Sequence, residues 1–232
     1  MRRLLVWAIL LAAIPCQVHA SMVNINFAGP GVSGNIQLTY GTATDAKYPQ
    51  AFEVTAISGT FSDMNSGLNI VNASISSLVS ITRDAPESMN LLAPNDFSKF
   101  HVASGLPVDN HGSLSFDNLF WPGGSVPTAS DYPVHGGFLD IYGLLFNIGG
   151  GRVVNLWSNG DFSGTGTGRI DYGVAVATSA QALDYVGGGV SAAVVPEPNT
   201  LVLLGTGLAG IVMWRRGRRK GRVQNYTLRG HE

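Results

Sequence analysis

Residues 137–158 read GFLDIYGLLFNIGGGRVVNLWS, and this stretch decides the fold class. Two apolar runs, 137–148 and 152–158, flank three consecutive glycines at 149–151. Glycine adopts positive φ angles without steric penalty, so a glycine cluster between two apolar runs is typical of a tight turn. Short and strongly apolar runs are typical of strands buried in a core. We therefore predict a β-hairpin at the centre of the hydrophobic core.

Strand patterns continue on both sides of this hairpin. Residues 23–27 and 36–40 alternate apolar and polar side chains, as strands do when one face lies on a core. The segment 68–82 follows a turn at Asp63–Gly67 and is long enough to predict a break near Ser76 and Ser77. The remaining strand candidates are 52–61, 114–121 and 170–178. We predict an all-β fold, an antiparallel β-sandwich of jelly-roll type, over residues 21–178.

The formal net charge of −1 hides an uneven distribution of charged residues. Residues 21–198 contain five basic and 14 acidic residues, a net charge of −9, and the other nine Lys and Arg residues lie at the two ends. Phosphate contacts need Lys and Arg, so this acidic stretch argues against nucleic acid as a partner. The single cysteine, Cys16, lies near the N-terminus, which excludes disulfides and cysteine-based sites from residues 21–198.

The N-terminus has the layout of a secretory signal peptide. Arg2 and Arg3 precede an apolar stretch over 4–14, and small or moderate side chains stand before Ser21. We predict a signal peptide over 1–20, cleaved between Ala20 and Ser21. Two alternatives remain: an uncleaved N-terminal anchor, for which the apolar stretch is short, and acylation of Cys16, which the neighbouring proline fits poorly.

The last quarter of the chain has a different organisation. Residues 179–194 are rich in small side chains and predict a flexible linker. An uncharged run over 199–214 follows, and as a helix it would be about 24 Å long, against about 30 Å for a bilayer core. A basic block over 215–220 should stay cytoplasmic by the positive-inside rule, followed by a short cytoplasmic tail over 221–232.

A proline-bounded motif precedes this run. Pro196 and Pro198 restrict φ, so the peptide around Glu197 should be extended and accessible. The motif begins at Val195, and the basic block consists of Arg215, Arg216, Arg218, Arg219 and Lys220.

In this order, the motif, the short apolar run and the basic block resemble the PEP-CTERM sorting domain over 195–220. The resemblance implies export in a Gram-negative, biofilm-forming bacterium with an extracellular polysaccharide system. It also implies a transient inner-membrane anchor and recognition by an exosortase, a membrane-embedded transpeptidase-like protease. An ordinary single-pass anchor is the alternative.

The residues that could bind a metal or a cofactor do not have the spacing of a known metal-binding or phosphate-binding motif. His101, His111 and His135 lack the spacing of metal ligands. Asp63–Gly67 resembles the start of a calcium loop, but Ser74 stands where such a loop has its last glutamate, so a turn is favoured. The glycine-rich loop 164–168 lacks the lysine of a phosphate-binding loop. We predict neither a metal nor a cofactor.

Residues that could support catalysis are equally sparse. There is no GxSxG nucleophile motif. Asp140, Asp161 and Asp171 are candidates for a carboxylate pair of the kind that hydrolyses glycosides. Trp121 and Trp157 are candidates for stacking on sugars, although packing in the core is favoured. We predict a non-enzymatic protein without catalytic residues, structural or adhesive in a polysaccharide biofilm. The alternatives are a secreted polysaccharide-acting enzyme and a carbohydrate-binding module.

Overall fold

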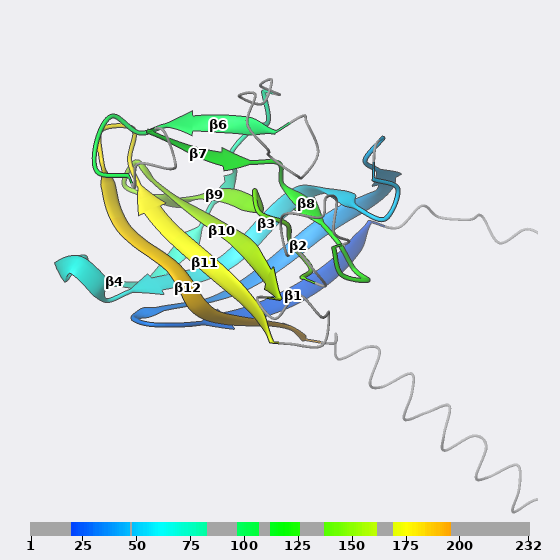
Figure 1. Ribbon diagram of the computed structural model, residues 1–232, viewed down its shortest axis with the longest axis horizontal. Coiled ribbons are helices and arrows are strands. Elements are labelled where there is room, and N and C mark those ends of the chain that lie inside the picture. The colour runs from blue at the N-terminus through cyan, green and yellow to red at the C-terminus, as the bar shows by residue number, and fades with distance from the viewer. Residues whose placement is uncertain are drawn as a thin grey trace, which may run out of the picture. The chain divides into compact units, whose positions relative to one another are not determined.

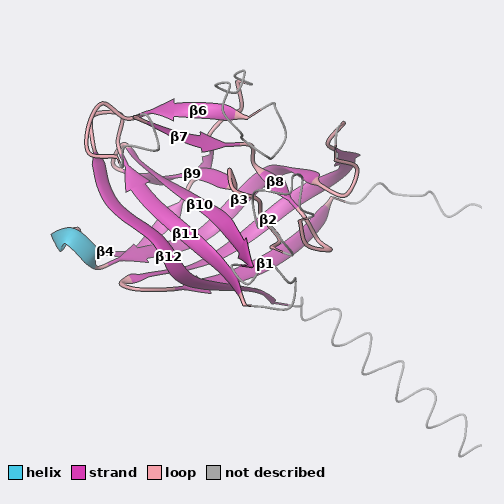
Figure 2. Cartoon of the chain, in the orientation of Figure 1, coloured by secondary structure: helices cyan, strands magenta, loops and turns pink. Residues whose placement is uncertain are grey.

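The computed structural model describes residues 20–46, 48–82, 97–106, 112–125, 137–161 and 169–195. These residues form β-strands and one short 3-10 turn, η1 (Asn65–Gly67), so the all-β prediction is confirmed (Figures 1 and 2). The strands are β1 (Ser21–Ala28), β2 (Val32–Thr44), β3 (Phe52–Asp63), β4 (Ile70–Ile75), β5 (Ser77–Leu78), β6 (Ser98–His101), β7 (Ser113–Phe116), β8 (Leu119–Phe120), β9 (Leu144–Gly149), β10 (Arg152–Asp161), β11 (Ile170–Ala177) and β12 (Ala182–Val195).

Ten of these strands form one sheet. Its order is β4-β3-β2-β1-β12-β11-β10-β9-β5, with β8 paired to β3. The two end strands, β4 and β5, are consecutive in the chain and only Ser76 separates them. The backbone N–H of Ser76 already donates to the carbonyl of Asn147 on β9, at 2.9 Å. One extended segment therefore passes from one end of the sheet to the other, and the sheet is nearly closed into a barrel (Figure 1).

This closure differs from the predicted sandwich of two separate sheets. The largest apolar cluster combines buried side chains of β1 to β4 with those of β9 to β12, so two halves do face each other across one core. The halves are joined because β12 lies between β1 and β11 in the sheet. The sequence prediction had placed most of β12 in a linker, and without this strand the two halves would be separate sheets.

The predicted flexible linker over 179–194 was wrong for most of its length. β12 pairs antiparallel with β11, from Ala182 opposite Ala177 to Val190 opposite Tyr172. The ladder register shifts around the glycines 187–189, where Gly189 has a φ of +78°. A Cβ on Gly188 would lie 2.6 Å from Oδ2 of Asp171. These glycines shape a bulge in a paired strand, where their small size and backbone freedom are required.

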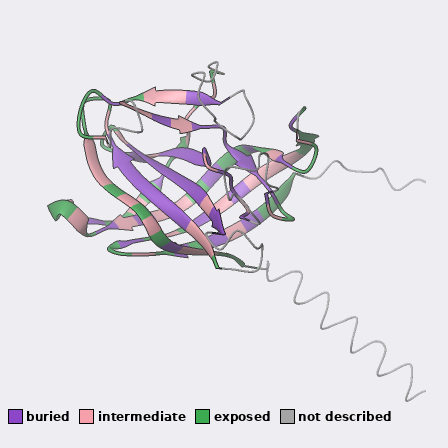
Figure 3. Ribbon diagram, in the orientation of Figure 1, coloured by how far each residue is buried: buried purple, intermediate pink, exposed green. Residues whose placement is uncertain are grey.

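The hairpin predicted from residues 137–158 is present as β9 and β10. Gly149, Gly150 and Gly151 all have positive φ, which explains the glycine cluster at the turn. Along β9 the side chains alternate between two covered faces: Phe146 packs in the main core, and Leu145 packs on the outside against β6 and β7. Burial on both faces explains why the run is apolar throughout, and Figure 3 shows the continuous burial of β10 and β11.

The outer apolar cluster explains the two-stranded sheet formed by β6 and β7. Val102 follows β6, Leu114 and Phe116 lie on β7, and all three pack against β9, β10 and β11. The predicted strand over 114–121 is split into β7 and β8 at Asp117 and Asn118, where Asn118 has a φ of 53°. The predicted break in 68–82 is confirmed at Ser76.

The predicted membrane segments fall largely outside the described residues. No helix within the described ranges is long and apolar enough to cross a bilayer. The apolar run 199–214 and residues 1–19 of the leader are not among the residues described.

Candidate functional site

The folded part of the chain extends to the first residue of the sorting motif. β12 ends at Val195, which is 37% exposed. Pro196, Glu197, Pro198 and the basic block (Arg215, Arg216, Arg218, Arg219 and Lys220) lie outside the described residues. At the other end, Ala20 is exposed and Ser21 begins β1, so the first strand starts where cleavage of the leader is predicted.

Asp140 lies in the loop that precedes β9 and is 3% exposed. Its Oδ1 accepts hydrogen bonds from the backbone N–H groups of Tyr142 and Gly143, at 2.9 and 3.0 Å. Its carboxyl group also shares a hydrogen bond with the carboxyl group of Asp117. Burial raises the pKa of Asp140. Because two ionised carboxylates have no donor between them and repel each other, we expect Asp117 and Asp140 to share a proton.

This pair fixes loop geometry. Asp117 is fully buried, and its Oδ1 accepts the backbone N–H of Leu119 at 3.1 Å. The two aspartates therefore hold the turns that lead into β8 and β9. Glycoside hydrolysis needs carboxyl groups about 5–10 Å apart and open to the sugar. Asp117 and Asp140 are in direct contact and buried, so they do not have the arrangement of a glycosidase carboxyl pair.

The other two candidate aspartates do not converge with Asp140. Asp161 is 1% exposed at the end of β10 and lies opposite Ile170 in the ladder. Asp171 is the next residue along β11, so the two side chains point to opposite faces of the sheet. The carboxylate of Asp171 accepts hydrogen bonds from the side chain of Asn159 and from the backbone N–H of Gly189. Asp171 thus stabilises the bulge in β12.

The candidate aromatic and histidine residues have structural positions where they are described. Trp121 is 1% exposed and Trp157 is 9% exposed, so core packing is confirmed for both. His101 is exposed at the end of β6, whereas His111 and His135 lie outside the described residues. Within the ranges that the structure covers, no three His, Cys, Asp or Glu side chains are grouped as metal ligands.

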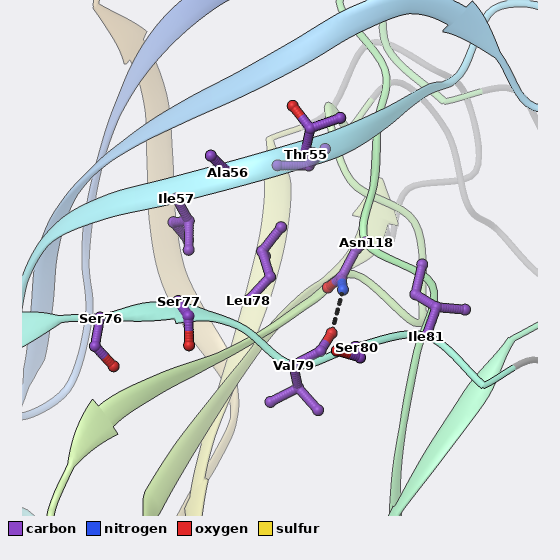
Figure 4. Close-up of a pocket in the computed structure, with 11 residues that line it drawn as sticks. Thr55, Ala56, Ile57, Ser76, Ser77, Leu78, Val79, Ser80, Ile81 and Asn118 are labelled. Carbon is purple, nitrogen blue, oxygen red and sulfur yellow. Dashed lines mark hydrogen bonds between the residues drawn. The ribbon is translucent and has the colours of Figure 1, made fainter.

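An open cleft lies where the sheet fails to close. It has a volume of about 510 Å³ and runs between residues 54–57 of β3 and residues 76–81 (Figure 4). Asn118 lies at its edge, where its side-chain amide donates to the carbonyl of Val79 at 2.9 Å and accepts the N–H of Leu145 at 2.9 Å. The lining consists of serine and threonine hydroxyls, apolar side chains and this one amide, without a titratable group.

The cleft can therefore bind an uncharged group through hydroxyl and backbone hydrogen bonds, and its lining contains no general acid or base. Sequence reasoning missed the cleft, because it forms between β3 and a segment that switches partners. It also missed Asp117 as the partner of Asp140, since only the fold brings the two loops together.

Comparison with known proteins identifies one segment. A family model described as the PEP-CTERM protein-sorting motif matches residues 194–219. No curated protein and no solved structure matches the chain. The match covers the motif, the apolar run and nearly all of the basic block that the sequence analysis had singled out. Residues 194–219 are therefore a PEP-CTERM protein-sorting motif, which implies a protein that is exported, processed by an exosortase and sorted to the cell envelope.

Proposed function

We propose that this protein is an exported surface protein whose β-sheet body has a structural or adhesive role in the extracellular polysaccharide of a biofilm. An exosortase would cut near Pro196, Glu197 and Pro198 while the apolar run 199–214 holds the chain in the inner membrane. The finished protein would begin at Ser21 and end near Val195. The observation that carries this proposal is the match of residues 194–219 to the PEP-CTERM motif.

The charge distribution supports the proposed route. The basic residues at both ends favour retention of those ends on the cytoplasmic side. The intervening stretch 21–198, with a net charge of −9, would then lie outside. A net negative charge keeps a protein soluble at high concentration and attracts cations, and both properties suit a polysaccharide matrix.

The proposed non-enzymatic role rests on the arrangement of the acidic groups. Asp117 and Asp140 are covered and in contact with each other, and the cleft beside β3 has no titratable lining residue. Binding of carbohydrate is the second candidate function. It is supported by the cleft, whose lining includes the hydroxyl groups of Thr55, Ser76 and Ser80. Those of Thr55 and Ser76 donate to the backbone carbonyls of Thr39 and Asn147, so toward a neutral sugar they would act as acceptors.

Processing can be tested with the variant Glu197→Ala in a host that has the exosortase. Mass spectrometry of the intact protein should give a wild-type product that begins at Ser21 and lacks residues beyond the motif. The Glu197→Ala protein should accumulate in the membrane fraction with its basic block still attached, as wild type should in a host that lacks the exosortase.

Glu53→Ala is the matched control, because it removes the same charge from an exposed position on β3. That variant should be processed like wild type. Normal processing of Glu197→Ala would reject the sorting proposal, and an intact Met1 in the mature protein would reject the predicted cleavage between Ala20 and Ser21.

A further inference from the structure

Asp63 is a fully buried carboxyl group at the end of β3. One of its oxygens, Oδ1, accepts the backbone N–H of Asn65 at 2.8 Å. The other, Oδ2, is buried and has no hydrogen-bond partner. A buried carboxylate oxygen without a donor is unfavourable, because it has lost its hydrogen bonds to water and gained none in the protein. This oxygen therefore needs a proton or a cation.

Asp184 on β12 reaches the same position from a distant part of the chain. Its Oδ2 accepts a hydrogen bond from the side chain of Asn65 at 3.0 Å, and its Oδ1 accepts the hydroxyl of Ser66 at 3.2 Å. The carboxyl groups of Asp63 and Asp184 are within hydrogen-bonding reach of each other. Two carboxylates in contact repel unless something positive lies between them.

The pKa of Asp63 also indicates that the carboxylate pair needs a positive group between its members. Burial, and to a smaller extent the negative charge of Asp184, raise the pKa of Asp63 to about 6. At neutral pH the pair thus carries two negative charges in contact for most of the time. No Lys or Arg contact with either carboxylate is among the interactions found for the described residues.

Apart from the side-chain amide nitrogen of Asn65, which donates to Asp184 and Pro30, the polar groups gathered here are oxygens of the kind that hard cations prefer. Besides the two carboxylates, the hydroxyl of Ser66 and the carbonyl of Pro30 lie here, the latter accepting the amide of Asn65 at 2.8 Å. The turn is tightly shaped, because Ser66 has a φ of 50° and Gly31 packs directly under the side chain of Asn65. Calcium accepts six to eight oxygen ligands in flexible geometry, whereas zinc favours nitrogen and sulfur.

We propose that Asp63 and Asp184, together with neutral oxygens of the turn that follows β3, form a calcium site. The ion would replace the missing partner of Asp63 Oδ2 and cancel the repulsion between the carboxylates. It would also join the β3–β4 turn to β12, the strand that leads into the sorting motif. Calcium sites of extracellular modules bind with dissociation constants of about 10⁻⁴–10⁻³ M, and this affinity range fits an exported protein.

The proposal is tested on the full chain, purified in detergent and stripped with EDTA. Its thermal unfolding and its binding heat are measured during titration with CaCl₂ and, separately, with MgCl₂. Calcium should raise the unfolding temperature progressively, and the binding heat should be half-saturated at about 0.1–1 mM free ion. Magnesium should have a much smaller effect, since it requires stricter octahedral geometry and keeps its water.

Two variants make the test specific. Asp63→Asn should remove the calcium response, yet in EDTA it should unfold at the same or a higher temperature, because it also removes the carboxylate repulsion. Asp184→Asn should weaken calcium binding at least about tenfold, as expected when one of two charged ligands is lost. Glu53→Gln removes one negative charge from an exposed position on β3 and is the matched control, which should keep the wild-type calcium response.

The absence of any calcium-dependent rise in the unfolding temperature of wild type would overturn the proposal. An unchanged calcium response in Asp63→Asn would overturn it equally. If wild type gains stability only on acidification and ignores calcium, the pair shares a proton and the site is not a cation site. None of these outcomes depends on whether the C-terminal motif is processed.

Discussion

The indole ring of Trp157 packs directly against Gly173, its partner across the β10–β11 ladder. A Cβ on Gly173 would stand 2.8 Å from Nε1 of Trp157 and closer still to two carbon atoms of the ring. The ring belongs to the outer apolar cluster that β6 and β7 cover. Its Nε1 donates to Asn159 at 2.9 Å, so both the position and the direction of the ring are determined. The ring of Trp157 thus occupies the space that a side chain at position 173 would need.

Gly173→Ala should therefore lower the free energy of unfolding by about 1–3 kcal/mol, the range typical of overpacking in a close-packed core. Urea denaturation measures this loss, provided that the dependence of the unfolding free energy on urea concentration is the same in variant and wild type. Gly123→Ala is the control, because nothing lies within 4 Å of a Cβ at that position, and its effect should stay below about 0.5 kcal/mol. Equal stability of the two variants would contradict this account of Trp157.

If Asp117 and Asp140 share a proton, two substitutions of Asp140 should lower the free energy of unfolding by different amounts. Asp140→Ala removes the acceptor of the Tyr142 and Gly143 N–H groups and leaves Asp117 alone in a buried site. The loss should be about 3–5 kcal/mol. Asp140→Asn keeps an acceptor oxygen and can donate to Asp117, so its loss should stay within about 1 kcal/mol. Chemical denaturation at pH 7 compares them, and similar losses would exclude a shared hydrogen bond.

Asp63 should make stability depend on pH in a defined direction when calcium is absent. Its pKa is raised from 3.8 to about 6, chiefly by burial, so the folded state holds a proton on Asp63 that the unfolded state has lost between these values. Stability must therefore fall as pH rises from about 4 to about 6, and the group makes its full unfavourable contribution above that range. The expected size is at most about 3 kcal/mol, since one pKa unit is about 1.4 kcal/mol and the Asp63 side chain is buried.

The measurement is the free energy of unfolding in EDTA at several pH values, for wild type and for Asp63→Asn. Burial also raises the pKa of Asp140, so this residue contributes to the pH dependence of both proteins. The difference between the two curves therefore gives the contribution of Asp63 alone. Wild type should lose stability relative to the variant as pH rises from 4 to 7. Parallel curves would show that Asp63 titrates normally in the folded protein.

The strands that the sequence predicted correctly are those with a local signal. Alternation of apolar and polar side chains marks 23–27 and 36–40, and these residues lie in β1 and β2. The glycine turn between two apolar runs marks the hairpin of β9 and β10. The break at Ser76 was predictable because the segment 68–82 is too long for a single regular strand. Each of these signals is contained in one short stretch of the sequence.

β12 was missed because its composition resembles that of a linker. Gly188 is required by its close contact with Asp171, which belongs to a different strand, and no local pattern contains that information. The near closure of the sheet was missed for the same reason, because it depends on the position of β12 between β1 and β11. The contacts of Asp117 with Asp140 and of Asp63 with Asp184 are also long-range. Residue type suggested only that Asp63–Gly67 is a turn, which η1 confirms.

The sorting motif could be predicted in full because its recognition features are contiguous. Two prolines, one glutamate, an apolar run and a basic block follow one another in the sequence, so they can be identified without knowledge of the fold. For the same reason the motif says nothing about the activity of residues 21–195. That activity depends on surfaces such as the cleft beside β3, which no stretch of sequence reveals.

The position of β12 has a mechanical consequence. Any pull on the C-terminal end, whether from a membrane or from a matrix polymer joined to it, enters the folded body along this strand. β12 has a neighbour on each side, β11 and β1, so a force along its axis loads many hydrogen bonds of both ladders in parallel. Strands loaded in this way slide only when many bonds fail together, whereas a frayed edge opens one bond at a time. The strand that leads into the sorting motif is therefore held against such a pull by a ladder on each side.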